Sequence, residues 1–62
     1  MASYVTVTQT EDNKKWAPVA MMYDSGTKEY RKIVWSMPTT DRSAAVSEGR
    51  RFAVDNDFEF IA

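Results

Sequence analysis

Residues 38–54 read PTTDRSAAVSEGRRFAV, and this stretch decides the fold. Pro38 cannot continue a central strand, and a Thr or Asp after it can accept hydrogen bonds from the first turn of a helix. From about Asp41 to Val54, apolar or small residues recur at helical spacing. They are Ala45, Val46, Gly49, Phe52 and Ala53. We therefore predict a helix over 41–54, which the polar residues 55–57 end.

The chain before this helix has the composition of three strands. Tyr4–Thr10, Trp16–Tyr23 and Tyr30–Met37 are rich in β-branched, aromatic and other apolar residues. Polar residues 11–15 and a turn containing Gly26 separate them, which indicates two successive hairpins. Residues 58–61 (FEFI) predict a short last strand. We expect a single α+β domain over residues 1–62, a small two-layer fold in which an antiparallel sheet of about four strands packs on the helix, in the order βββαβ.

The side chains that this sequence lacks argue against catalysis. It contains no Cys and no His, so the thiol nucleophile, the commonest general base and the principal zinc ligands are missing. Asp55 and Asp57 are the nearest carboxylate pair, and we interpret them as the end of the helix. We expect no enzyme activity, no catalytic residue, no cofactor and no metal.

Charge and hydropathy add little about partners. Eight basic and nine acidic residues give a formal net charge of -1, which favours neither nucleic acid nor any other partner. The longest largely apolar stretch, Trp16–Tyr23, is too short to cross a bilayer, so we expect no membrane partner. The first four residues show no secretory signal, and we expect a cytoplasmic location.

Alternation along the strands sorts the predicted sheet into two faces. The face under the helix is predicted to carry Val5, Val7, Ala17, Val19, Met21, Ile33, Trp35, Phe58 and Phe60. Gly49 indicates a close approach of the helix to a bulky residue, for which Trp35 is the candidate. The opposite face is predicted to carry Tyr4, Thr6, Thr8, Trp16, Pro18, Ala20, Met22, Tyr30, Lys32, Val34 and Ile61.

That opposite face is too apolar for open water, so we interpret it as a contact surface. Its expected partner-binding residues are Tyr4, Trp16, Met22, Tyr30, Lys32 and Val34. Two alternatives remain open. A bulge at Pro18 would return Trp16 or Met22 to the core, and the methylenes of Lys15 and Lys32 would cover some of the aromatic rings.

The main hypothesis for function is a protein-interaction module that forms a homodimer or binds another protein, through this aromatic face or through an unpaired edge of the sheet. The alternative is single-stranded nucleic-acid binding by the same face, with lysines at the phosphates and aromatic rings on the bases. The helix text at 39–45 and 49–53 resembles that of many small bacterial and bacteriophage domains in which a meander precedes an Ala-rich helix. This resemblance implies a free-standing accessory protein, such as a phage-encoded inhibitor that occupies a partner's surface.

Overall fold

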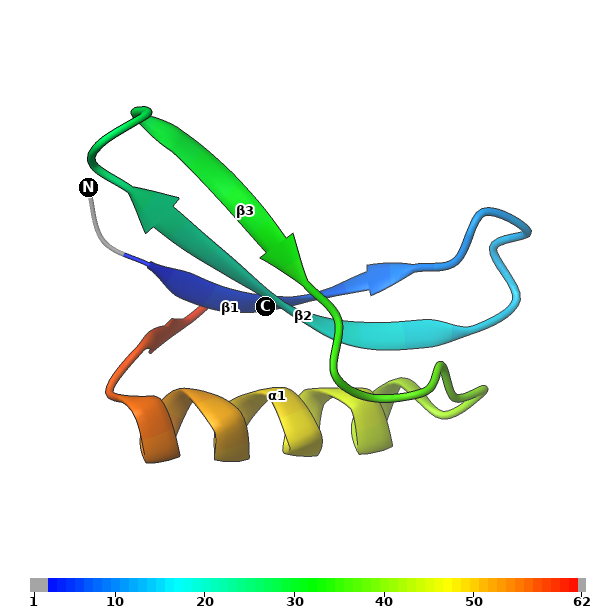
Figure 1. The fold of residues 1–62 in the computed structure, drawn as a ribbon. Coiled ribbons are helices and arrows are strands. Elements are labelled where there is room, and N and C mark those ends of the chain that lie inside the picture. The colour runs from blue at the N-terminus through cyan, green and yellow to red at the C-terminus, as the bar shows by residue number, and fades with distance from the viewer. Residues whose placement is uncertain (1–2, 62) are drawn as a thin grey trace.

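The computed structural model describes residues 3–61, which form a four-stranded sheet with one helix against one of its faces (Figure 1). The elements are β1 (Tyr4–Gln9), β2 (Trp16–Asp24), β3 (Glu29–Ile33), α1 (Arg42–Asn56) and β4 (Glu59–Phe60). The strand order in the sheet is β3-β2-β1-β4. The predicted α+β class, the two layers and the order βββαβ are confirmed. The sheet is mixed rather than antiparallel throughout, because β4 runs parallel to β1.

Local interactions fix both ends of α1. A side-chain oxygen of Asp41 accepts a hydrogen bond from the Ser43 N–H at 2.9 Å, so Asp41 is the N-cap. At the other end Asp57 adopts the left-handed conformation with φ 56°, and the Phe58 N–H donates to the Ala53 carbonyl at 2.8 Å. This cap turns the chain directly into β4.

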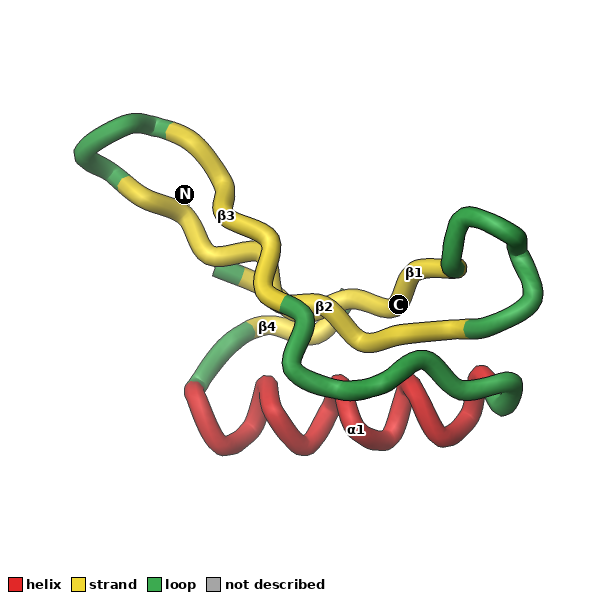
Figure 2. Tube along the Cα trace, turned by 45° about the vertical axis from the view of Figure 1, so that its right-hand side comes forward, coloured by secondary structure: helices red, strands yellow, loops and turns green. Residues whose placement is uncertain are grey.

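The third strand is shorter than the sequence predicts. It ends at Ile33, and the segment after it runs alongside α1 to the start of the helix (Figure 2). At the end of this segment Thr39 pairs with Trp16, where the Trp16 N–H donates to the Thr39 carbonyl at 2.7 Å and the Thr39 N–H donates back at 2.8 Å. Residues 34–38 therefore lead from the middle of β2, where Ile33 pairs with Ala20, to its first residue, Trp16.

The first hairpin decides which side chains face the helix. The Thr10 N–H donates to the Lys15 carbonyl at 3.0 Å, so the pairing continues to Lys15 and the turn spans only residues 11–14. Asn13 makes this tight turn possible with a positive φ of 58°. The resulting register pairs Val5 with Ala20 and continues without a bulge to Gln9 and Trp16.

This register corrects the predicted faces of β2. A turn over 11–15 would have placed odd-numbered residues of both strands on one face, whereas the turn over 11–14 places odd residues of β1 beside even residues of β2. The helix side therefore carries Trp16, Pro18, Ala20 and Met22, and the other side carries Ala17, Val19 and Met21. Both sets are the reverse of the prediction, with no bulge at Pro18.

The core lies between α1 and the centre of the sheet. Val5 and Ala20 are 0% exposed and Ala53 is 2% exposed. Five larger side chains pack around them: Met22, Trp35, Phe52, Phe58 and Phe60. A Cβ at Gly49 would lie 2.8 Å from Cε1 of Phe60. The predicted close approach at this glycine is confirmed, but the neighbour is Phe60, whereas Trp35 stacks on Phe52 with ring centroids 4.0 Å apart.

Candidate interaction surfaces

Three tyrosines gather on the outer face of the sheet, the face opposite α1. Tyr4, Tyr23 and Tyr30 come from β1, β2 and β3, which are adjacent strands. The Tyr30 ring centroid lies 5.7 Å from that of Tyr4 at 65° and 5.2 Å from that of Tyr23 at 61°. Both contacts are edge-to-face, the arrangement that aromatic quadrupoles favour. We call these three half-buried residues the tyrosine cluster.

Within residues 3–61, no second layer covers the tyrosine cluster. Helix α1 lies against β1, β2 and β4 from the other side (Figure 1). On that side Gly49 approaches Val5 and Pro18. Lys32 shares the outer face because it pairs with Met21, and its side chain is exposed. The described part of the chain therefore places half-buried aromatic rings and an exposed lysine on a sheet face that carries no second layer.

The structure keeps three of the six predicted partner-binding residues together. Tyr4, Tyr30 and Lys32 lie on the outer face, as predicted. Trp16 and Met22 do not, because the β1–β2 register directs them toward α1. Arg42 at the start of α1 lies over the Trp16 ring, 5.4 Å from its centroid, and Met22 packs against the core.

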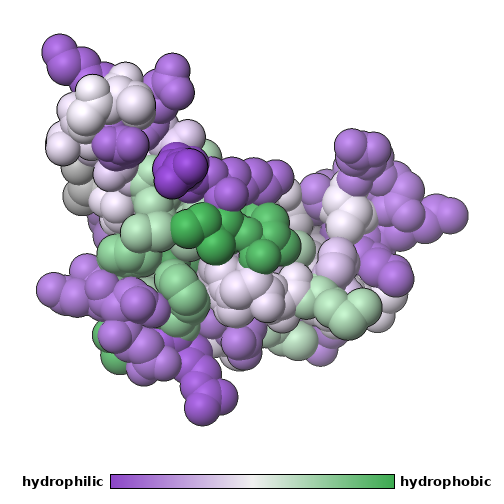
Figure 3. Space-filling model, in the orientation of Figure 1, coloured by the Kyte–Doolittle hydropathy of each residue, from purple (hydrophilic) through white to green (hydrophobic). Residues whose placement is uncertain are grey.

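The remaining predicted residue, Val34, lies just beyond β3. It is 53% exposed, and the neighbouring Ile33 is 39% exposed. Figure 3 shows strongly hydrophobic surface at the centre of that view, with hydrophilic surface above it and surface of intermediate hydropathy below it. We call Ile33 and Val34 the apolar patch.

Sequence reasoning missed Tyr23, although a signal for it was present. All three tyrosines of the chain lie on the outer face, whereas the helix side holds both tryptophans and all three phenylalanines: Trp16, Trp35, Phe52, Phe58 and Phe60. A tyrosine hydroxyl favours a position that reaches water or a polar partner. The type of aromatic residue thus predicts the face better than alternation alone.

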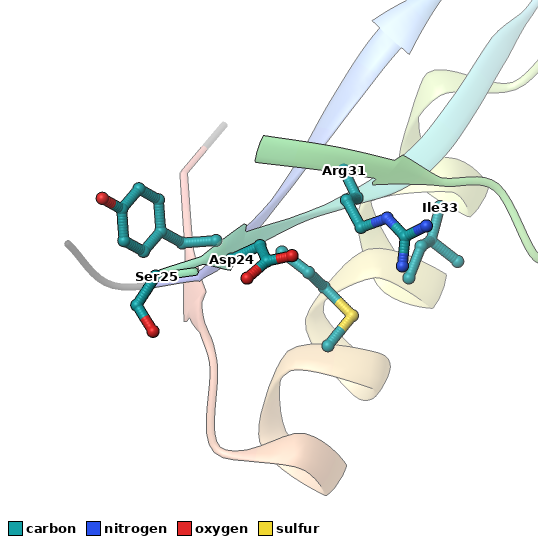
Figure 4. A pocket seen from close by; sticks show the side chains of 6 residues that line it. Asp24, Ser25, Arg31 and Ile33 are labelled. Carbon is teal, nitrogen blue, oxygen red and sulfur yellow. The ribbon is translucent and has the colours of Figure 1, made fainter. Parts of the chain in front are cut away.

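A hollow of about 320 Å³ lies beside the turn of the second hairpin (Figure 4). Its lining residues are Met22, Tyr23, Asp24, Ser25, Arg31 and Ile33. Helix α1 lies against β1, β2 and β4 but does not contact β3, the strand that supplies Arg31 and Ile33 to this hollow. A carboxylate oxygen of Asp24 accepts the Gly26 N–H at 2.9 Å, which fixes that side chain to the turn. Ile33 joins this hollow to the apolar patch.

Residues 3–61 contain no group of three or more acidic side chains placed to hold a metal ion. No helix in the same range is long and apolar enough to span a bilayer. In comparisons with known proteins, no family model, no curated protein and no solved structure matches this chain.

Proposed function

We propose that this chain is a small, non-catalytic protein-interaction module that binds through the tyrosine cluster on the outer face of its sheet. One observation carries the proposal. Three half-buried tyrosines from adjacent strands hold one another edge to face on a side that no element of residues 3–61 covers.

The physical properties of these rings suit a protein partner. Tyrosine supplies a large contact area, and its hydroxyl tolerates water before binding and offers a hydrogen bond afterwards. Rings already held by neighbouring rings lose little side-chain entropy in a complex. Aromatic residues clustered in this way are typical of the anchors that dominate binding energy.

The partner would be a second copy of this chain or another protein whose surface the module occupies and inhibits. A standard interface buries about 800 Å² on each partner. The accessible surface of this chain is 4526 Å², so one such contact would take roughly a sixth of it. The proposal also includes two parts that rest on the sequence alone. The protein would be an accessory inhibitor of the bacteriophage type, and it would act in the cytoplasm.

Affinity capture from an extract of the native host tests the proposal with matched variants. Tyr23→Ala removes one ring of the tyrosine cluster, and Val54→Ala removes an apolar side chain that is 80% exposed on α1. We expect wild type and Val54→Ala to retain the same partner and Tyr23→Ala to lose it, with all three proteins folded by circular dichroism. Equal capture by all three would contradict the proposal.

Self-association needs its own measurement. Sedimentation velocity over a range of concentrations should show a dimer for wild type and Val54→Ala, and a monomer for Tyr23→Ala, if the partner is a second copy. A monomer at every concentration leaves another protein as the partner. A dimer that Tyr23→Ala does not weaken would place self-association on a different surface.

Lys32 beside the tyrosine cluster supports a second candidate, the binding of single-stranded nucleic acid. A lysine next to aromatic rings suits a phosphate next to a base. The rings lie at 61° and 65° to one another, however, which is not a flat stacking platform, and the net charge is -1. The test is a titration with a mixed oligonucleotide at low salt, monitored by NMR. The tyrosine ring signals would shift only if this candidate holds.

A further inference from the structure

The outer edge of β3 has main-chain groups turned away from the sheet. The Tyr23 N–H donates to Oγ of Ser3 at 3.1 Å, on the β1 side of β2. Backbone groups alternate in direction along an antiparallel strand, so Met21 also turns its groups away from β3. Lys32 is paired with Met21, and its N–H and C=O accordingly point outward. Since β3 is the last strand at this side of the sheet, this edge can accept another strand.

The charge of this edge differs from that of the whole chain. Lys28, Arg31 and Lys32 contribute three positive charges against the single negative charge of Glu29, and all four side chains are exposed. Two such edges would repel each other, because like charges across a strand pair are destabilising. The same charges attract an acidic strand, so an acidic partner fits this edge better than a second copy does.

At the end of β3 the two sides offer different contacts, although Arg31 also places a charge on the helix side. Lys32 lies on the outer side, whereas Ile33 lies on the helix side and lines the hollow of about 320 Å³ together with Met22 and Arg31. Successive residues of an added strand point to opposite sides. One set would meet Lys32, and the alternate set would meet Ile33 and the hollow.

We propose that the β3 edge binds an extended segment of a partner protein, in which acidic residues alternate with apolar residues, as an additional strand. Main-chain hydrogen bonds give the affinity in this mode of recognition, and alternate side chains give the specificity. This inference rests on the proposed function, because it names the class of protein segment that the interaction module binds.

A synthetic peptide tests this directly. The probe is a short, end-capped peptide in which glutamate alternates with valine, and the control peptide has lysine in place of glutamate. Titration into the isotope-labelled protein should shift the Lys32 amide signal in the NMR spectrum and slow its hydrogen exchange. The lysine peptide should leave both unchanged, and added salt should weaken the binding of the glutamate peptide.

Two substitutions at one position separate the main chain from the charge. Lys32→Pro removes the outward N–H without touching the ladder to β2, and we expect it to weaken binding about tenfold. Lys32→Ala keeps that N–H and should weaken binding only about twofold to threefold. Because Lys32→Ala folds as an ordinary edge substitution, it keeps the test valid if the proline variant does not fold.

The result also separates this inference from the proposed function. Tyr4→Ala should leave peptide binding within about twofold, since Tyr4 comes from β1, two strands away from the β3 edge, and does not line the hollow. No shift at Lys32, equal binding of the lysine peptide, or equal binding by Lys32→Pro would overturn the inference. So would protection of the Lys32 amide that rises with protein concentration in the absence of peptide, because the occupant would then be a second copy. None of these outcomes depends on whether Tyr23→Ala loses its partner in the capture experiment.

Discussion

The two faces of this sheet share one backbone but differ in the aromatic residues they carry. The helix side holds tryptophan and phenylalanine around Val5 and Ala20, which are 0% exposed. The aromatic residues of the outer side are all tyrosines, and all of them are half-buried. Rings without a polar atom gain most from complete removal from water, whereas a tyrosine keeps its hydroxyl where it can be solvated. The comparison shows that residue chemistry, as well as strand alternation, sorts a small sheet into an inside and an outside.

We also expect the two faces to differ in their contribution, with the helix side mainly supporting stability and the outer side mainly supporting binding. Gly49 lets α1 approach Phe60 and Val5 closely, so the helix side is a packed interior. On the outer side, the rings contact one another but no second layer within residues 3–61. We therefore expect substitutions on the helix side to change the free energy of unfolding, and substitutions in the tyrosine cluster to change mainly the binding of a partner. Val19 is 2% exposed on the outer side and belongs with the residues that support stability.

Truncating one ring on each face gives the largest expected difference. Phe52→Ala removes the stack on Trp35 and the contact with Phe58, whose centroid lies 6.1 Å away, and should cost about 3 kcal/mol of unfolding free energy. Tyr23→Ala removes one edge-to-face contact on the half-buried face and should cost about 1 kcal/mol. Urea denaturation followed by circular dichroism measures both. Equal losses would mean that the outer face contributes as much to stability as the core does.

The close approach at Gly49 provides the next prediction. Alanine is a better helix former than glycine by about 1 kcal/mol, but its Cβ would lie 2.8 Å from Phe60 and 3.4 Å from Cγ1 of Val5. We expect Gly49→Ala to destabilise the protein by about 1 kcal/mol net.

The sign of this effect should reverse when the ring is removed. In a Phe60→Ala background, Gly49→Ala should stabilise by about 0.5–1 kcal/mol, because only the gain in helix propensity remains. Thermal denaturation of the four proteins of this double-mutant cycle measures the coupling. If Gly49→Ala had the same effect with and without the Phe60 ring, close packing would not explain the glycine.

Local sequence patterns were sufficient to predict the elements and their order. Residues 38–54 contain a strand terminator, a capping residue and a helical spacing of apolar residues, and α1 begins within one residue of the predicted start. The faces of β1 and β3 were also predicted correctly, so Tyr4, Tyr30 and Lys32 lie on the face where they were expected.

The faces of β2 could not be predicted, because they depend on a single residue in the turn. Whether Lys15 belongs to the turn or pairs with Thr10 changes the pairing by one position, and every side chain of β2 then changes sides. Composition does not distinguish these cases, since Lys15 is polar in either one. Asn13 has a positive φ in the shorter turn. The choice between the two turns therefore depends on the backbone conformation at Asn13. Trp16 and Met22 were consequently placed on the wrong face.

The N-cap of α1 supports only the helix side, so its removal should affect one face alone. Asp41→Ala removes the acceptor of the Ser43 N–H and should cost about 1 kcal/mol of unfolding free energy. Asp41→Asn retains an acceptor and serves as the control, with a much smaller expected loss. Chemical denaturation measures both variants, and NMR should show no shifts in the tyrosine cluster. Equal losses for the alanine and asparagine variants would rule out the cap as the cause.

The smallest expected effect lies in the turn that sets the register of β2. The Thr10 hydroxyl donates to a carboxylate oxygen of Asp12 at 2.5 Å, and this hydrogen bond, together with the Lys14 N–H at 3.1 Å, lowers the pKa of Asp12 below its ordinary value. A carboxyl whose pKa is lower in the folded state contributes stability above its unfolded pKa, and that contribution is lost as the pH falls through the folded pKa.

Thr10→Val should therefore raise the pKa of Asp12 toward its ordinary value and reduce the sensitivity of this turn to acid. Thr8→Val is the matched control, because the Thr8 hydroxyl donates to the Gln9 carbonyl instead. An NMR titration of the Asp12 carboxyl in the three proteins measures the change, and an unchanged pKa in Thr10→Val would show that the hydroxyl does not hold the turn.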